Sequence, residues 1–159
     1  MAADTHLHTL QFSGHGDSSA LERQVTLAGE GVEFAVATDH NHQTDYAPFQ
    51  EEAELSRFYT TVVGNEVTTD VGHFNGFPLP AKGPLPAHDL KDYVAIVDGI
   101  RAKGAKVVIL NHPRWPSYED SPFTNEKLDL YTGAFASGLR LTVDATASRS
   151  GAPYGSAQI

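Results

Sequence analysis

The chain has 159 residues, a formal net charge of −9 at neutral pH and a hydrophobic content of 40%. This composition predicts one globular domain with a sizeable core, and it argues against a disordered chain. The acidic balance disfavours binding to nucleic-acid backbones. No apolar run reaches the roughly 18 residues of a membrane helix. The absence of cysteine excludes disulfides and thiolate metal sites.

The first predicted strand, over residues 4–8, presents three side chains that can bind metal on one face. Residues i, i+2 and i+4 of a strand point the same way, so Asp4, His6 and His8 share that face. Two imidazoles beside a carboxylate suit a divalent cation such as zinc. Because any metal must use nitrogen and oxygen ligands here, zinc, manganese, iron and magnesium all stay open.

Helix and strand patterns alternate after a glycine-rich loop over 11–17 that contains His15. Ser19 and Glu22 have the spacing of a capping box, which predicts a helix from about 19 to 30. The next predicted elements are a strand over 33–38, a helix over 47–58, and strands over 60–67 and 72–77. Four prolines predict a loop over 78–86.

The second half of the chain continues this alternation. A helical spacing of apolar residues predicts a third helix over 90–104, and 106–110 is the clearest buried strand. A weaker helix pattern covers 125–131, and a last strand is predicted over 139–143. Short apolar strands between amphipathic helices indicate βα units, an α/β fold class and a largely parallel sheet.

Residues that can bind metal gather where the predicted strands end, which is where α/β folds place their functional side chains. These residues are His6, His8, His15, Asp39, His40, Glu66, His73 and His112. Each one alone is adequately explained as a polar residue that caps a strand. The set as a whole predicts a metal site.

Five short motifs in this chain resemble, in their order, those of the polymerase-and-histidinol-phosphatase (PHP) domain family of metal-dependent phosphoesterases. They are Asp4-Thr5-His6-Leu7-His8-Thr9, Thr38-Asp39-His40-Asn41, Gly64-Asn65-Glu66, Gly72-His73 and Asn111-His112-Pro113. The resemblance implies a distorted (β/α)7 TIM-like barrel. It also implies two or three divalent metal ions (Zn, Mn or Fe) at the carboxyl ends of the strands.

The resemblance further implies which residues bind each metal. Glu66 would bridge the first and second metals. The histidine ligands would be His6 and His8 for the first metal, His73 and His112 for the second, and His15 and His40 for the third. Asp4 and Asp39 would orient neighbouring histidines, as carboxylates behind a metal ligand do.

The chain departs from the family pattern near its end. The family closes its site with a late Asp-x-His pair, and no such pair follows His112 here. A complete barrel of this type also needs about 200 residues or more. We therefore expect 1–144 to be a PHP-like domain with the first five or six strands, and 145–159 to be a flexible tail or loop. The chain is expected to be either a fragment or a degenerate member of the family.

The expected function is hydrolysis of a small-molecule phosphate ester by a metal-activated water. Glu66 and His112 would be the catalytic metal ligands, and Arg114 would bind the substrate phosphate. Two alternatives are a non-catalytic metal-binding module and an exonuclease-like phosphodiesterase. No membrane or nucleic-acid partner is expected, and an open barrel edge would favour self-association. The first residues lack the basic-then-apolar pattern of a signal peptide. Met1 to Ala3 lead almost directly into the first predicted strand, as expected for a chain cut from a longer precursor, so the sequence does not predict the compartment.

Overall fold

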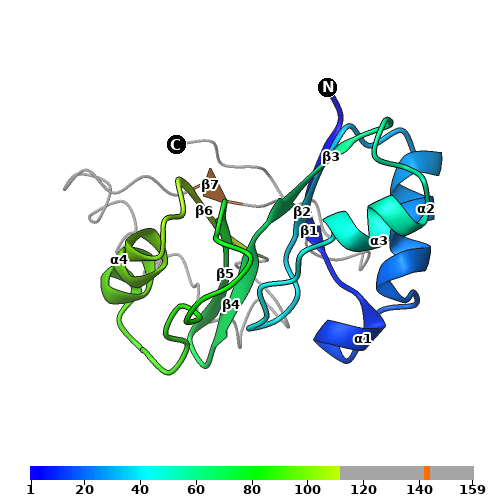
Figure 1. Ribbon diagram of the computed structural model, residues 1–159. Coiled ribbons are helices and arrows are strands. Elements are labelled where there is room, and N and C mark those ends of the chain that lie inside the picture. The colour runs from blue at the N-terminus through cyan, green and yellow to red at the C-terminus, as the bar shows by residue number, and fades with distance from the viewer. Residues whose placement is uncertain (112–141, 144–159) are drawn as a thin grey trace, which may run out of the picture.

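The computed structural model describes residues 1–111 and 142–143, and Figure 1 shows their arrangement. The strands are β1 (Ala3–Leu7), β2 (Phe34–Ala37), β3 (Thr60–Val63), β4 (Asn65–Thr69), β5 (Gly72–Phe77), β6 (Val107–Leu110) and β7 (Thr142–Val143). The helices are α1 (Leu10–Ser13), α2 (Ala20–Gly29), α3 (Ala47–Glu52) and α4 (Tyr93–Ala102). His112, Arg114, the helix predicted over 125–131 and the tail predicted over 145–159 lie outside the described residues.

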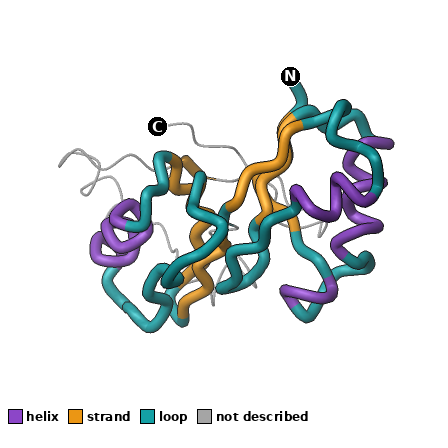
Figure 2. Tube along the Cα trace, in the orientation of Figure 1, coloured by secondary structure: helices purple, strands orange, loops and turns teal. Residues whose placement is uncertain are grey.

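The described strands form two sheets that share one continuous chain segment. One sheet has the order β1-β2-β3 with all strands parallel, and the other has the order β4-β5-β6-β7. Only Gly64 separates β3 from β4. The chain after β2 also runs beside β4, because the backbone N–H of Asn41 donates to the carbonyl of Glu66 at 2.9 Å. The segment 60–69 therefore connects the two sheets (Figure 2).

β5 is antiparallel to both of its neighbours, which differs from the largely parallel sheet that the sequence predicts. Only Asp70 and Val71 connect β4 to β5, and so short a connection must reverse the chain. His73, at the start of β5, consequently lies beside the carboxyl end of β6, where the Asn111 N–H donates to its carbonyl at 2.9 Å. Closure into the expected barrel, and self-association through an open edge, stay predictions.

The predicted first helix and its cap are confirmed in α2. Ser19 Oγ accepts the Glu22 N–H at 3.2 Å, and Glu22 Oε2 accepts the Ser19 N–H at 2.9 Å. α3 is shorter than predicted: Glu54 has a left-handed φ of 59°, and the Leu55 N–H turns back to the Gln50 carbonyl. The chain leaves the helix there because Leu55 packs onto the core beneath α2.

Residues 10–13 form the short helix α1, although the sequence predicts a loop from residue 11. The turn ends at Gly14, whose φ of 73° requires the left-handed conformation that glycine adopts without strain. The residue before the turn, Thr9, is held by hydrogen bonds from its N–H and its hydroxyl to Asp39. A contact between distant residues therefore determines this local structure.

Strand alternation divides the side chains between the outer faces and the interior. The outer faces pack under helices in two core clusters. One cluster, under α4, comprises Val67, Phe74, Leu79, Ile96, Val97, Ile100, Ala105, Val108 and Leu110. The other, on β1 and β2, comprises Leu7, Leu27, Ala35, Ala37, Tyr46 and Tyr59. A third cluster of Val36, Phe77 and Ile109 joins β2 of one sheet to β5 and β6 of the other.

The interior face changes from apolar to polar towards one end. Counting back along β5 from Phe77, the side chains at alternate positions are Asn75 and then His73. Two positions after Ile109 of β6 is Asn111, which directly follows the strand. The third core cluster therefore forms an apolar floor. The polar residues above it include Glu66 near the start of β4, His73 near the start of β5 and Asn111 directly after β6.

We expect Gly64→Ala to destabilise the junction between the two sheets. An added Cβ would lie 2.8 Å from Val36 Cγ1 and 2.9 Å from the Ala37 carbonyl oxygen. Overpacking of this kind costs about 1–3 kcal/mol, measurable by urea unfolding. The control is Gly99→Ala in α4, where nothing lies within 4 Å of the added atom, so alanine should stabilise the helix by about 0.5–1 kcal/mol. Equal midpoints for the two variants would contradict the prediction.

Candidate metal site

The Glu66 side chain has 0% exposure, and histidine nitrogens surround its carboxylate. Oε1 lies 3.1 Å from His73 Nδ1 and 3.4 Å from His6 Nε2. Oε2 lies 3.0 Å from His40 Nδ1 and 3.1 Å from His8 Nε2. A buried carboxylate is costly unless positive charge or hydrogen-bond donors surround it. The four imidazoles can meet this need by holding either protons or cations.

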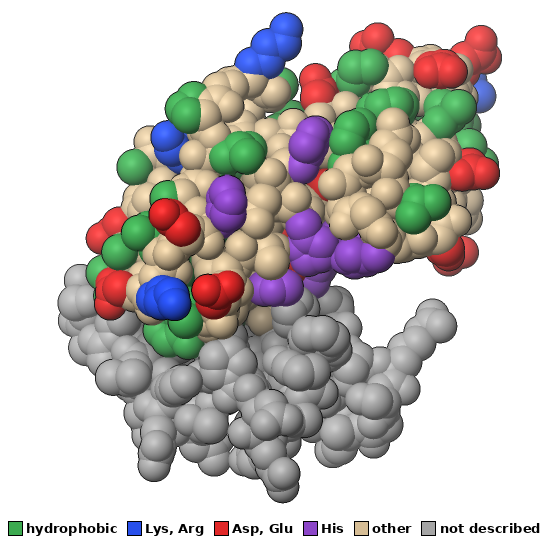
Figure 3. Space-filling model, turned by 90° about the horizontal axis from the view of Figure 1, so that it is seen from below, with side chains coloured by type: hydrophobic (Ala, Val, Ile, Leu, Met, Phe, Trp, Pro, Cys, Tyr) green, Lys and Arg blue, Asp and Glu red, His purple; other side chains and the backbone are tan. Residues whose placement is uncertain are grey.

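Three overlapping groups of ligand atoms have the compactness that a metal ion requires. In each group the atoms lie within 4.8 Å of one another. The groups are His6, His8 and Glu66; His40, Glu66 and His73; and His8, His15 and His40. Imidazole and carboxylate ligands at about 2.0–2.2 Å are the donor set of zinc and of similar divalent cations. The residues present therefore fit such ions. Figure 3 shows histidine side chains gathered on one face of the molecule.

The structure brings together every predicted ligand that it describes. The group of His6, His8 and Glu66 is the set implied for the first metal. His15 and His40, implied for the third, are joined here by His8. The predicted contributions of His112 and Arg114 lie outside the described residues. Occupation of these positions by metal stays a prediction.

Asp39 is fully buried and anchors the loops that follow β1 and β2. Oδ1 accepts the Thr9 N–H at 2.8 Å, the Thr9 hydroxyl at 2.9 Å and the Ser13 hydroxyl at 2.7 Å. Oδ2 accepts the hydroxyls of Thr44 at 2.7 Å and Tyr46 at 3.2 Å. Burial and the adjacent Asp39 charge raise the pKa of Tyr46 well above its usual value. These contacts connect Asp39 to the histidines through Ser13.

Asp4 acts on the backbone of its own strand. Its Oδ1 accepts the N–H of His6 at 3.0 Å. This bond reaches the main chain of His6, and the expectation that Asp4 orients a histidine ring stays a prediction.

Two asparagines link the carboxylate to the first strand, and sequence reasoning gave neither a role. Asn111 Nδ2 donates to Glu66 Oε1 and to Asn75 Oδ1, both at 2.7 Å. Asn75 Nδ2 donates to the Thr5 carbonyl of β1 at 2.7 Å. The two amides therefore connect β1, β4, β5 and β6 beneath the histidines. Asn75 stands two positions after the predicted ligand His73, and Asn111 stands directly before the predicted ligand His112. A polar residue so close to a predicted ligand, in or next to an apolar strand, was the signal that could have identified them.

Thr68 is a further residue that sequence reasoning missed. Its hydroxyl lies 2.6 Å from His40 Nδ1. The Asn41 side chain holds the Thr68 backbone from both sides, accepting its N–H at 2.9 Å and donating to its carbonyl at 3.1 Å. Asn41 has a left-handed φ of 47°, which asparagine adopts more readily than most residues.

His15 is the most exposed member of the cluster. Its Nε2 lies 2.7 Å from His40 Nε2. Partial desolvation and the charges of His8 and His40 lower the pKa of His15. A lowered pKa favours the neutral imidazole, which is the form that binds metal.

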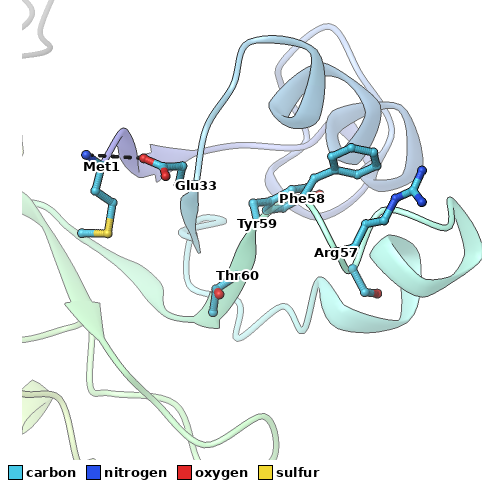
Figure 4. A pocket seen from close by; sticks show the side chains of 7 residues that line it. Met1, Glu33, Arg57, Phe58, Tyr59 and Thr60 are labelled. Atoms are coloured by element: carbon cyan, nitrogen blue, oxygen red, sulfur yellow. Dashed lines mark ion pairs between the residues drawn. The ribbon is translucent and has the colours of Figure 1, made fainter.

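A separate shallow hollow lies at the amino ends of strands β2 and β3 in the first sheet (Figure 4). Its lining includes Glu33, Arg57, Phe58 and Thr60, which are at or before the amino ends of β2 and β3. It shares no residue with the histidine cluster. The helices of the described residues are all too short or too polar to cross a bilayer.

No protein-family model matches the chain, and the search of curated proteins gives no significant match. The relation to the PHP family therefore stays a proposal supported by the ordered motifs and by the side-chain geometry.

We expect Asp39→Asn to destabilise the protein by about 3 kcal/mol, because the amide NH₂ would face hydroxyl and N–H donors that now reach a buried carboxylate. The loss should appear in urea unfolding of metal-free protein. Asp17→Asn is the control, since the Asp17 side chain is 87% exposed and pairs with Arg23 at the surface, where ion pairs contribute little. An unfolding midpoint for Asp39→Asn equal to that of the control would contradict the prediction.

Proposed function

We propose that the chain binds two or three divalent cations (Zn, Mn or Fe) at the histidine cluster and hydrolyses a small-molecule phosphate ester. The supporting observation is the buried Glu66 carboxylate with histidine nitrogens at 3.0–3.4 Å from its oxygens. The resemblance to the PHP family adds the reaction class.

When bound, a pair of cations would polarise the phosphate and lower the pKa of a water molecule towards about 7. Glu66 is suited to contact two cations, because each carboxylate oxygen faces a different pair of histidines. The Asn111 amide holds one of these oxygens in place. In this proposal Arg114 binds the substrate phosphate by paired hydrogen bonds.

The apolar floor below the cluster contributes by excluding water from one side. Val36, Phe77 and Ile109 are nearly fully buried, so among the described residues this side of the cluster is closed by apolar side chains. A low-dielectric floor also strengthens the electrostatic interactions above it.

A non-catalytic metal-binding module is the main competing function, because the late Asp-x-His pair of the family is missing. An exonuclease-like phosphodiesterase is the third candidate. The net charge of −9 disfavours it, since binding to a nucleic-acid backbone depends on neutralising its phosphates.

Metal content is the first test of the proposal. Protein purified without chelator should contain two or more transition-metal ions per chain by inductively coupled plasma mass spectrometry. Glu66→Gln should lose at least one, because a neutral amide is a poor bridge between cations. His112→Ala should also lose one. The control is His88→Ala, an exposed histidine outside the cluster, and it should keep the full content. Parent protein without metal above background would refute the proposal.

Activity separates the enzyme from a binding module. The metal-loaded chain should hydrolyse p-nitrophenyl phosphate, and Glu66→Gln should lower kcat/KM at least about 100-fold, as loss of a bridging ligand removes charge stabilisation of the transition state. Bound metal without turnover would favour the binding module. Turnover of bis(p-nitrophenyl) phosphate in preference to the monoester would favour the phosphodiesterase.

A further inference from the structure

The two ring nitrogens of His40 have different neighbours. Nδ1 lies 2.6 Å from Thr68 Oγ1 and 3.0 Å from Glu66 Oε2. Nε2 lies 2.7 Å from His15 Nε2. A neutral imidazole has one protonated nitrogen and one lone pair, so these neighbours determine which nitrogen can bind a cation.

Both neighbours of His40 Nδ1 require a proton on that atom. The Thr68 hydroxyl donates its single proton to the Glu66 carbonyl at 3.2 Å, so towards His40 it acts as an acceptor. An ionised Glu66 carboxylate is an acceptor only. The proton of neutral His40 therefore lies on Nδ1, and the lone pair lies on Nε2, facing His15.

The same reasoning applies to His8 through a different hydroxyl. Ser13 Oγ donates its single proton to Asp39 Oδ1 at 2.7 Å. It is therefore an acceptor for His8 Nδ1 at 3.0 Å and for the His40 backbone N–H at 3.2 Å. Glu66 Oε2, which is also an acceptor, lies 3.1 Å from His8 Nε2, so Ser13 holds the proton of neutral His8 on Nδ1 only when a cation occupies Nε2.

We propose that the hydroxyls of Thr68 and Ser13 are positioning groups for one cation shared with His15. Thr68 fixes the proton of His40 on Nδ1 and so leaves Nε2 to the cation, and Ser13 accepts the Nδ1 proton of His8 once His8 Nε2 binds the same cation. The inference rests on the proposed function for the presence of that cation. It also decides between two of the compact groups, because His40 faces Glu66 and His73 with its protonated nitrogen and so belongs with His8 and His15.

Both hydroxyls are held by other parts of the fold. Thr68 and Glu66 alternate on the interior face of β4, so one strand positions the carboxylate and the hydroxyl together. The Asn41 amide fixes the Thr68 backbone. Ser13 ends the α1 turn, which Asp39 anchors at Thr9. Neither hydroxyl needs to reorganise when a cation binds.

The first measurement is the tautomer of each histidine in metal-free protein, from long-range ¹H–¹⁵N correlation spectra of labelled chain. We expect His40 to be protonated on Nδ1 when neutral. Protonation of neutral His40 on Nε2 alone would overturn the inference, whether or not the chain binds metal.

The second measurement is the affinity for added Zn²⁺ or Mn²⁺ by isothermal titration calorimetry. Thr68→Val should weaken the cation site by about 10–100-fold, the usual effect of removing a partner of a ligating histidine. Thr68→Ser restores the hydroxyl and should restore the affinity, and Ser13→Ala should weaken it. The control is Thr60→Val, because Thr60 is exposed and stands at the amino end of β3, outside the histidine cluster.

The two proposals fail in different ways. If Thr68→Val binds cations as tightly as the parent, or if Thr68→Ser does not recover, the positioning role is wrong while the proposed function stands. If the parent binds no cation although the His40 ring is protonated on Nδ1, the proposed function is wrong, and the role of the hydroxyls towards a cation is refuted with it. Thermal unfolding of each variant identifies any loss of affinity that comes from misfolding.

Discussion

The burial of the Glu66 carboxylate is the constraint on which the site depends. A charged oxygen pair away from water must have donors or positive charge close by, and imidazole nitrogens and the Asn111 amide occupy those positions. Histidine meets this need in two ways, as a protonated donor or as a ligand of a cation. The residues that surround the carboxylate are therefore also the residues that could hold a metal.

The sheet junction explains how one carboxylate reaches four histidines that lie on or shortly after β1, shortly after β2 and on β5. The chain passes from β3 to β4 at Gly64, where a close approach to Val36 and Ala37 leaves no space for a side chain. This approach places β4 beside the end of β2, and the reversal at Asp70 and Val71 then returns β5 along its other side. The ligands consequently converge although they are far apart in the chain.

The polar groups behind the ligands form two systems with separate tasks. Asp39 gathers hydroxyl and N–H donors from the loops after β1 and β2. Asn75 and Asn111 connect β1, β5 and β6 under the carboxylate. Both oxygens of Asp39 accept hydrogen bonds, and such networks favour one arrangement over alternatives. The Asp39 system also reaches a histidine ring, because Ser13, which donates to Asp39, lies 3.0 Å from His8 Nδ1.

The sequence by itself determined the strands around His6 and His73, the capping box at Ser19 and the gathering of ligands at strand ends, because alternation and local caps are short-range rules. Only the tertiary structure decided that the single strand predicted over 60–67 divides at Gly64 into β3 and β4. It also decided that α3 ends early, that β5 runs antiparallel and that residues 10–13 form a turn. It also decided the roles of Thr68 and Asn75. These features depend on contacts between residues far apart in the chain, such as Asn75 with Thr5, which no local pattern contains.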